Sequence, residues 1–184
     1  MAGRPPRRTV LLALEKSGAG EGRLALDLGC GDGRDTVALL RRGWRVLAID
    51  AEEAAIARLK QRPDLPEGAA LETRCARFET LELPPAELVN ASFALPLVAP
   101  EDFPALWQKL AAALMPGGRF AGQLFGERDS WHGEKAITFL PRAAAARLLD
   151  GFEIDLFEEE ETDATTPYGT AKHWHLFHIV ARKR

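Results

Sequence analysis

The chain has 184 residues, of which 46% are hydrophobic and 28% charged, the balance of an ordinary globular domain. This length fits one domain with a substantial core, and we expect residues 1–184 to form it, with residues 1–20 as an N-terminal helical cap. The net charge of −3 provides no long-range attraction to nucleic acid or to an anionic membrane. The two cysteines, Cys30 and Cys75, are too few for a disulfide framework and are expected to be buried thiols. We also expect no metal site.

The two ends of the sequence carry short basic stretches. Arg4, Arg7 and Arg8 form one, residues 182–184 form the other, and both are typical of solvated chain ends. No apolar run approaches the roughly 20 residues that cross a bilayer, and no apolar segment of a secretory signal follows the first arginines. We therefore expect a cytoplasmic monomer or homodimer with neither a membrane nor a nucleic-acid partner.

Strand and helix patterns alternate along most of the chain. Apolar runs predict seven strands, at residues 24–28, 45–49, 70–74, 88–93, 119–125, 152–157 and 174–182. Helical spacing and Gly/Pro stops predict helices at residues 9–16, 33–43, 51–61, 102–114 and 141–149. This order predicts an α/β fold with a doubly wound, mostly parallel sheet and a C-terminal antiparallel hairpin. The acidic residues 158–169 would form the exposed connection of that hairpin.

A glycine-rich turn follows the first predicted strand. Gly29, Gly31 and Gly33 stand at alternate positions between a strand and a helix. Glycine permits positive φ and close approach of a ligand, and the helix N-terminus offers free N–H groups. Asp50 closes the next strand, where a carboxylate accepts bonds from ribose hydroxyls. The spacing is G-x-G-x-G and not the G-x-G-x-x-G of a dinucleotide site, so an NAD-dependent oxidoreductase remains the less favoured alternative.

The segment from Asp27 to Gly33, with Asp50 after the second strand, resembles the first motifs of class I S-adenosylmethionine-dependent methyltransferases. The turn at residues 115–120 and the closing hairpin are also similar to that family. The small size resembles the compact methyltransferases related to the tellurite-resistance methyltransferase. The resemblance implies a Rossmann-like methyltransferase fold and S-adenosyl-L-methionine as the cofactor. It implies that the cofactor contacts Asp27, Gly29, Cys30, Gly31, Gly33, Asp50, Ala51, Ala76, Arg77, Phe78 and Asn90.

The acceptor of the methyl group is less well defined by the residues. Methyl transfer is an in-line displacement in which the protein chiefly positions the nucleophile, so the catalytic residues stay unknown. The segments 92–98 and 125–132 follow the fourth and fifth predicted strands, and we expect a small-molecule acceptor there. The candidates on the substrate side are Phe93, Arg128, Trp131 and His173, while His175 and His178 fit structural roles. Arg4 and Arg8 are candidates for covering the cofactor carboxylate. A cofactor-binding module without catalysis is a further alternative.

Overall fold

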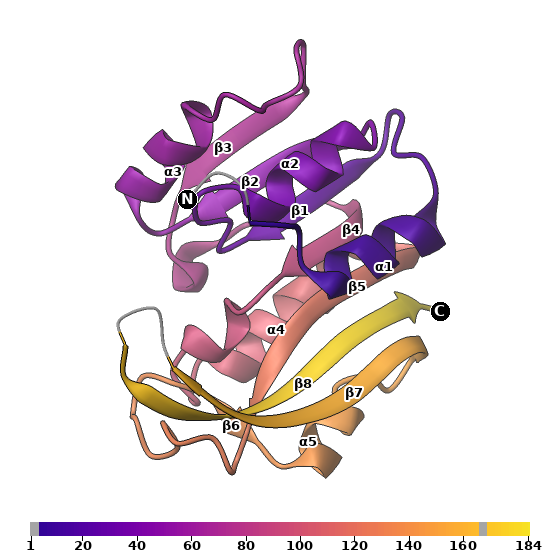
Figure 1. Ribbon diagram of the computed structural model, residues 1–184. Coiled ribbons are helices and arrows are strands. Elements are labelled where there is room, and N and C mark those ends of the chain that lie inside the picture. Colours follow the sequence, from indigo (N-terminus) through magenta and orange to yellow (C-terminus); the bar gives the residue numbers. More distant parts are fainter. Residues whose placement is uncertain (1–3, 166–168) are drawn as a thin grey trace.

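The computed structural model describes residues 4–165 and 169–184, in which one mixed sheet is covered by helices on both faces (Figure 1). Five strands run parallel, and the last two complete the sheet as an antiparallel pair. The order across the sheet is β3 (Leu71–Cys75), β2 (Arg45–Asp50), β1 (Leu24–Leu28), β4 (Ala86–Ala91), β5 (Leu114–Gly126), β8 (Ala171–Lys183) and β7 (Phe152–Thr165). The two-residue β6 (Phe139–Leu140) pairs with the end of β5. The predicted fold class is confirmed.

The helices divide between the two faces, and each face has its own hydrophobic core. One core packs under α1 (Arg8–Ser17), α2 (Arg34–Arg41) and α3 (Glu53–Lys60). The other packs under α4 (Phe103–Ala113) and α5 (Arg142–Arg147). Successive side chains of a strand point to opposite faces of the sheet, so each strand contributes to both cores. Ala25 packs in the first core and its neighbour Leu26 in the second. Short 3₁₀ turns, η1 (Phe78–Thr80) and η2 (Leu95–Leu97), follow β3 and β4.

The strand order reverses beside β1, and this reversal places the candidate site. The chain adds β2 and β3 on one side of β1, then crosses to add β4 on the other. Ligands of open α/β sheets bind at such a switch point, beyond the carboxyl ends of the strands. Register pairs Asp27 of β1 with Ala48 of β2 and with Asn90 of β4. The polar residues picked out by the sequence therefore meet at this edge.

The helix predicted at residues 9–16 forms as α1 and packs against β5 and β8. Its buried residues include Val10, Ala13 and Leu14, which lie on one helical face. Among the described residues, no helix combines the length and apolar character needed to span a membrane.

Two expectations about strand ends were wrong. The turn predicted at residues 115–120 lies within β5, which starts at Leu114. The register between β5 and β4 shifts between Ala86 and Leu88, so the pairing is irregular there. The connection predicted at residues 158–169 is mostly strand, because β7 continues to Thr165 and β8 begins at Ala171. Residues 166–168 lie outside the described part of the chain.

One expectation about the cysteines was also wrong. Cys30 is buried, but Cys75 is exposed, with its Sγ 3.5 Å from the Ala51 carbonyl oxygen. Cys75 ends β3 near the edge of the sheet, where few elements are available to cover it.

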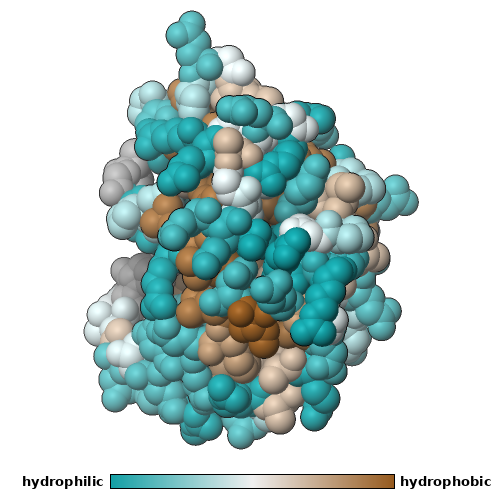
Figure 2. Space-filling model, turned by 90° about the vertical axis from the view of Figure 1, so that its right-hand side faces the viewer, coloured by the Kyte–Doolittle hydropathy of each residue, from teal (hydrophilic) through white to brown (hydrophobic). Residues whose placement is uncertain are grey.

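The surface is mostly hydrophilic on the face shown in Figure 2, with a small apolar patch low on that face. The large apolar side chains that are exposed in the described chain are Leu11, Leu97, Met115 and Ile154. Among these four, Leu97 lies beside the candidate site.

Candidate functional site

A cleft with two adjoining lobes opens at the carboxyl ends of the parallel strands. The first lobe has a volume of about 460 Å³ and the second about 360 Å³. Gly29, Gly31, Arg58 and Phe93 line both lobes, so the two are continuous around the glycine turn.

The glycine turn forms the floor of the cleft, and its three glycines adopt positive φ angles of 66°, 56° and 80°. A Cβ on Gly29 would lie 2.5 Å from the Ala94 Cβ, and one on Gly33 would collide with Leu59 Cδ1. A Cβ on Gly31 would meet no protein atom within 4 Å. Gly29 and Gly33 are thus required by packing, whereas Gly31 keeps space in the cleft free. Gly33 itself lines neither lobe and caps the N-terminus of α2.

Asp50 stands at the end of β2 and lines the first lobe. Its Oδ2 accepts a 2.8 Å bond from the Gly31 N–H, and its Oδ1 accepts a 2.9 Å bond from the Glu52 N–H. An ionised carboxylate has about four acceptor positions, so two of them remain for a ligand. The backbone bonds hold the carboxylate in place at the wall of the lobe.

The far end of the first lobe is lined by the residues after β2 and β3. Ala51, Ala76, Arg77 and Phe78 all line it, as expected, and the Ala76 N–H donates to the Asp50 carbonyl oxygen at 3.0 Å. Apolar lining of this slot also comes from the segment after β4, through Ala94, Leu97 and Val98. Apolar side chains of this kind suit the faces of a planar ring.

Asp27 and Asn90 form a buried polar pair at the base of the second lobe, each 1% exposed. The Asn90 amide donates to Asp27 Oδ1 at 2.8 Å, and the Thr36 hydroxyl donates to Oδ2. The Ser92 hydroxyl donates to Asn90 Oδ1 at 2.9 Å. Burial, followed by the charge of Asp35, raises the pKa of Asp27 to about 7, although both hydrogen bonds oppose the rise.

Cys30 lines the second lobe beside this pair. Burial, followed by the charges of Asp27 and Asp50, raises the pKa of its thiol. A thiol held in its neutral form is a poor nucleophile, so Cys30 acts as a small wall residue.

Phe93 lies where the lobes meet. It was expected to end the fourth strand, but β4 stops at Ala91 and Phe93 has a positive φ of 56°, which is rare for a bulky residue. Its N–H donates to Gln123 Oε1 at 3.1 Å, and the Arg7 guanidinium carbon lies 4.3 Å from the centre of its ring. Backbone strain held by surrounding contacts is common at binding sites.

The N-terminal segment lines the second lobe, and the expectation of a solvated chain end is correct for Arg4 and Arg8, which are exposed, but not for the half-buried Arg7. Arg4 and Arg7 line this lobe. Arg8 does not line either lobe, and pairs with Glu158 of β7 at 2.6 Å. Sequence reasoning missed Arg7. The signal available in the sequence was its position between the proline pair and the start of α1.

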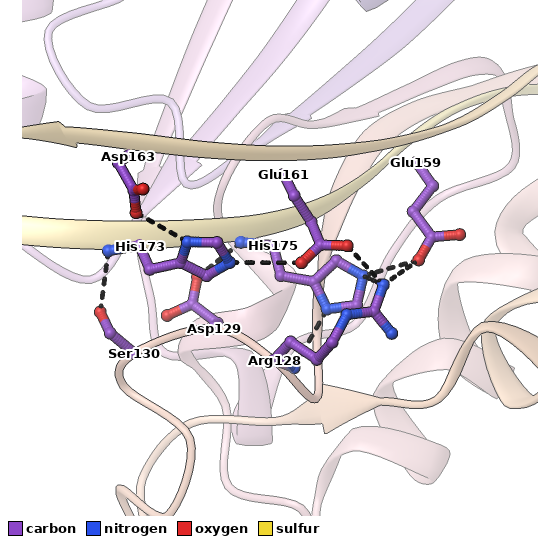
Figure 3. A network of polar contacts seen from close by, with 8 residues as sticks. All are labelled: Arg128, Asp129, Ser130, Glu159, Glu161, Asp163, His173 and His175. Atoms are coloured by element: carbon purple, nitrogen blue, oxygen red, sulfur yellow. Dashed lines mark hydrogen bonds and ion pairs between the residues drawn. The ribbon is translucent and has the colours of Figure 1, made fainter.

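Three further candidates, Arg128, Trp131 and His173, lie outside both lobes. Figure 3 shows Arg128 and His173 beside the β7–β8 hairpin. Arg128 Nη2 lies 2.6 Å from carboxylate oxygens of both Glu159 and Glu161. His173 contacts Asp163 at 2.8 Å and Glu161 at 3.3 Å, and these acceptors raise its pKa. These side chains hold β7 to β8 and to the loop after β5.

Trp131, the remaining candidate, packs around a buried ion pair. Lys172 and Asp129 are in direct contact and their side chains are fully buried. The Lys172 Nζ lies 3.8 Å from the Trp131 ring centre and 4.3 Å from that of Trp174. Trp174 meets Phe93 edge-on at 6.3 Å, so Trp131 is connected to the cleft only indirectly through these rings.

A group of potential metal ligands, Glu159, Glu161 and His175, places its donor atoms within 4.8 Å of one another. Arg128 Nη2 already contacts both carboxylates and lies 3.2 Å from His175 Nε2. His175 Nδ1 also accepts from the Arg128 N–H at 3.0 Å. The guanidinium supplies the positive charge here, so we assign these residues to ion pairing.

Comparison with known proteins relates this cleft to one family. The family model described as "Methyltransferase domain" matches residues 25–118. Carboxy-S-adenosyl-L-methionine synthase of Shewanella loihica is 33% identical over 97 residues, which are 50% of this chain and 40% of that protein. A probable ribosomal RNA small subunit methyltransferase A of Methanospirillum hungatei is 33% identical over 135 residues, 70% of this chain and 52% of that protein. The chain thus spans about half or less of these relatives.

Solved structures share the fold at lower identity. TehB from Haemophilus influenzae superposes with a TM-score of 0.80 at 18% identity, over 95% of this chain and 61% of that one. The 1,6-didemethyltoxoflavin-N1-methyltransferase of Burkholderia thailandensis, crystallised with its substrate and S-adenosylhomocysteine, gives 0.71 at 22% identity. That match covers 96% of this chain and 77% of the other.

Proposed function

The chain belongs to the methyltransferase domain family, and from this premise we propose that it transfers the methyl group of S-adenosylmethionine to a small-molecule acceptor. The observation that carries the proposal is the continuous cleft around Gly29 and Gly31, with Asp50 on one side and Asp27 with Asn90 on the other. An acid with free acceptor capacity, an apolar slot and a buried polar pair match the ribose, the adenine and the amino-acid end of this cofactor in turn.

The residues of the cleft fit the cofactor on several grounds. Asp50 has two unused acceptor positions for the ribose hydroxyls. Phe78 and Leu97 line the slot that would hold the adenine ring. Asp27 lines the second lobe, where its carboxylate would accept from the ammonium group of the methionine end. When bound, S-adenosylmethionine supplies a methyl group already activated on a sulfonium, so the chain needs only to orient the acceptor and exclude water.

The acceptor is proposed to be small because the charge of the chain does not favour RNA. The net charge is −3, and the arginines that line the two lobes are accompanied by an equal number of acidic residues. The cleft therefore has no excess of positive charge with which to bind RNA phosphates. The apolar rim at Phe93, Leu97 and Val98, with Leu97 57% exposed, offers contact to an uncharged part of a small acceptor. One relative is a probable ribosomal RNA methyltransferase, so RNA belongs in the test.

The test uses S-adenosylmethionine labelled on its methyl group, with purified full-length protein and separate pools of small amines, phenols, thiols, carboxylates and oxyanions. Ribosomal RNA forms a parallel arm. We expect label in at least one small-molecule pool, and none in it with Asp50→Ala. Transfer to RNA alone would contradict the small-acceptor proposal. Cofactor binding without any transfer would favour a binding module, and binding of NADH in place of S-adenosylhomocysteine would favour an oxidoreductase.

A further inference from the structure

The second lobe is lined by charges of both signs. Asp27 lies at its buried base, next to Asn90. Arg4 and Arg7 enter from the N-terminal segment, which crosses over the lobe ahead of α1. An amino-acid group carries an ammonium and a carboxylate a few bonds apart. A lobe lined by both a buried acid and guanidinium groups is complementary to such a zwitterion.

Arg7 is the best placed of the guanidinium groups. Its backbone N–H donates to Asp35 Oδ1 at 2.8 Å, which fixes the segment to the start of α2. Its side chain lies flat over the Phe93 ring, and Nη1 donates to the Ser92 carbonyl oxygen at 3.3 Å. A guanidinium carries five N–H donors, so this single side-chain bond leaves capacity for a two-pronged bond to a carboxylate.

The other arginines at the lobe are less suited to this role. Arg4 is paired with Asp32 at 3.9 Å and its side chain is 47% exposed. Arg34 donates from Nε to the Pro5 carbonyl oxygen, and Arg58 faces Glu52 at 3.9 Å with 57% exposure. Arg7 is half-buried, and its charge is stacked on an aromatic face rather than paired with an acidic side chain.

The geometry points to Arg7 as the residue that binds the α-carboxylate of the cofactor's amino-acid end, which makes residues 4–7 a strap over the second lobe. This inference rests on the proposed function, because it takes S-adenosylmethionine as the ligand. It adds a specific requirement: affinity depends on the carboxylate of the ligand, through Arg7. Arg7 also contacts Phe93, which lines both lobes. The residue proposed to bind the carboxylate therefore also contacts a residue expected on the acceptor side.

The experiment compares two ligands by calorimetry, S-adenosylhomocysteine and its decarboxylated analogue, S-adenosyl-3-thiopropylamine. The full-length wild type should bind the first about tenfold or more tightly than the second, since a charged two-pronged bond is lost. Arg7→Met keeps an apolar stem over Phe93 but removes the donors, so this ratio should fall to about threefold or less. Arg8→Ala removes a neighbouring arginine that pairs with Glu158 outside the lobe and should keep the wild-type ratio.

Further arms separate the competing explanations. Arg7→Met should bind 5′-methylthioadenosine, which lacks the amino-acid end, as the wild type does. An equal loss of affinity for all three ligands in Arg7→Met would show a structural effect and overturn the inference. An affinity ratio that stays unchanged in Arg7→Met would also overturn it. So would a ratio that falls only in Arg4→Met or Arg34→Met. If Arg7→Met does not fold, Arg7→Lys replaces it, with an intermediate ratio expected and a wild-type ratio overturning the assignment. If the wild type binds both ligands equally, the carboxylate site is refuted but the proposed function is not. Wild type that binds neither would refute the proposed function.

Discussion

At the scale of single residues, Asp27 shows how the cleft is prepared for a cation. Its hydrogen-bond donors, Thr36 and Asn90, are neutral, and the nearby charge of Asp35 raises its pKa more than the charge of Arg7 lowers it. A buried carboxylate in such surroundings favours its protonated form. A bound ammonium group would add a positive charge beside it and favour the ionised form. Cofactor binding and the protonation of Asp27 should therefore be coupled.

This coupling predicts how affinity and stability change with pH. The pKa of Asp27 is raised from 3.8 to about 7. Between these two pH values, Asp27 of the folded ligand-free protein holds a proton that Asp27 of the unfolded chain has released. The stability contributed by Asp27 is full below pH 3.8 and is lost as the pH rises through about 7. Affinity for S-adenosylhomocysteine should change in the opposite direction and increase as the pH rises through about 7.

Calorimetry and thermal unfolding of the wild type and of Asp27→Asn, between pH 5.5 and 8.5, check both trends. The variant has no ionisable group at this position, so its differences from the wild type should isolate Asp27 from groups such as His173. Identical pH profiles for the two proteins, in either measurement, would contradict the role given to Asp27.

The glycine turn gives a second prediction at this scale. Gly33→Ala brings a Cβ against Leu59 at a positive φ, so we expect a loss of about 2 kcal/mol or more in the free energy of unfolding. Gly31→Ala meets no protein atom and should cost about 1 kcal/mol through its φ alone. Its methyl group enters the cleft, so it should nevertheless weaken S-adenosylhomocysteine binding. Urea unfolding and calorimetry measure the two effects, and wild-type affinity in Gly31→Ala would contradict this placement of the ligand.

These residues also mark how far the sequence predicts the site. The glycines, Asp27 and Asp50 carry a spacing that fixes their place on a strand–turn–helix, and ten of the eleven residues expected at the cofactor line the cleft. Gly33 lines neither lobe and packs closely against Leu59. Arg7 could not be found in this way, because its position depends on how the N-terminal segment crosses the sheet, a contact between residues distant in sequence.

At the scale of elements, the β7–β8 hairpin shows why local composition misled the prediction. Consecutive glutamates are poor strand formers, so residues 158–169 were expected to be a loop. In the folded chain these acids find cationic or histidine partners: Glu158 pairs with Arg8, Glu159 with Arg128, and Glu160 with His178. These partners come from α1, from the loop after β5 and from β8, so contacts with distant segments support a strand that its own sequence does not favour.

The buried Lys172–Asp129 pair fastens this hairpin to the loop after β5. Asp129 also accepts N–H bonds from Trp131 at 3.0 Å and from His175 at 3.2 Å. Asp129→Ala leaves Lys172 charged and buried among aromatic rings, so we expect a loss of about 3–5 kcal/mol in the free energy of unfolding. Asp163→Ala, which removes an exposed acid beside His173, is the matched control and should leave the unfolding midpoint nearly unchanged. Equal midpoints for the two variants in urea unfolding would rule out this fastening role.

At the scale of the whole molecule, the sheet order decides where chemistry is possible. Alternating strand and helix patterns predicted the parallel sheet and its closing hairpin, because burial on both faces leaves a clear apolar signal. The crossover beside β1 then gathers Asp27, Asp50 and Asn90 at one edge although they are far apart in sequence. Arg128 and His173 were expected near this edge, but neither lines a lobe. Both side chains instead pair with acids of β7.

The most direct test of this account is a calorimetric titration of S-adenosylhomocysteine into the wild type and Asp50→Ala, with Asp150→Ala, an exposed acid outside both lobes, as the control. Asp50 supplies charged acceptors to the ribose, so we expect Asp50→Ala to weaken binding by about 100-fold while Asp150→Ala binds as the wild type does. Asp50→Asn, with one acceptor oxygen retained, should fall between them. Equal affinity in Asp50→Ala and the wild type would contradict the placement of the cofactor in this cleft.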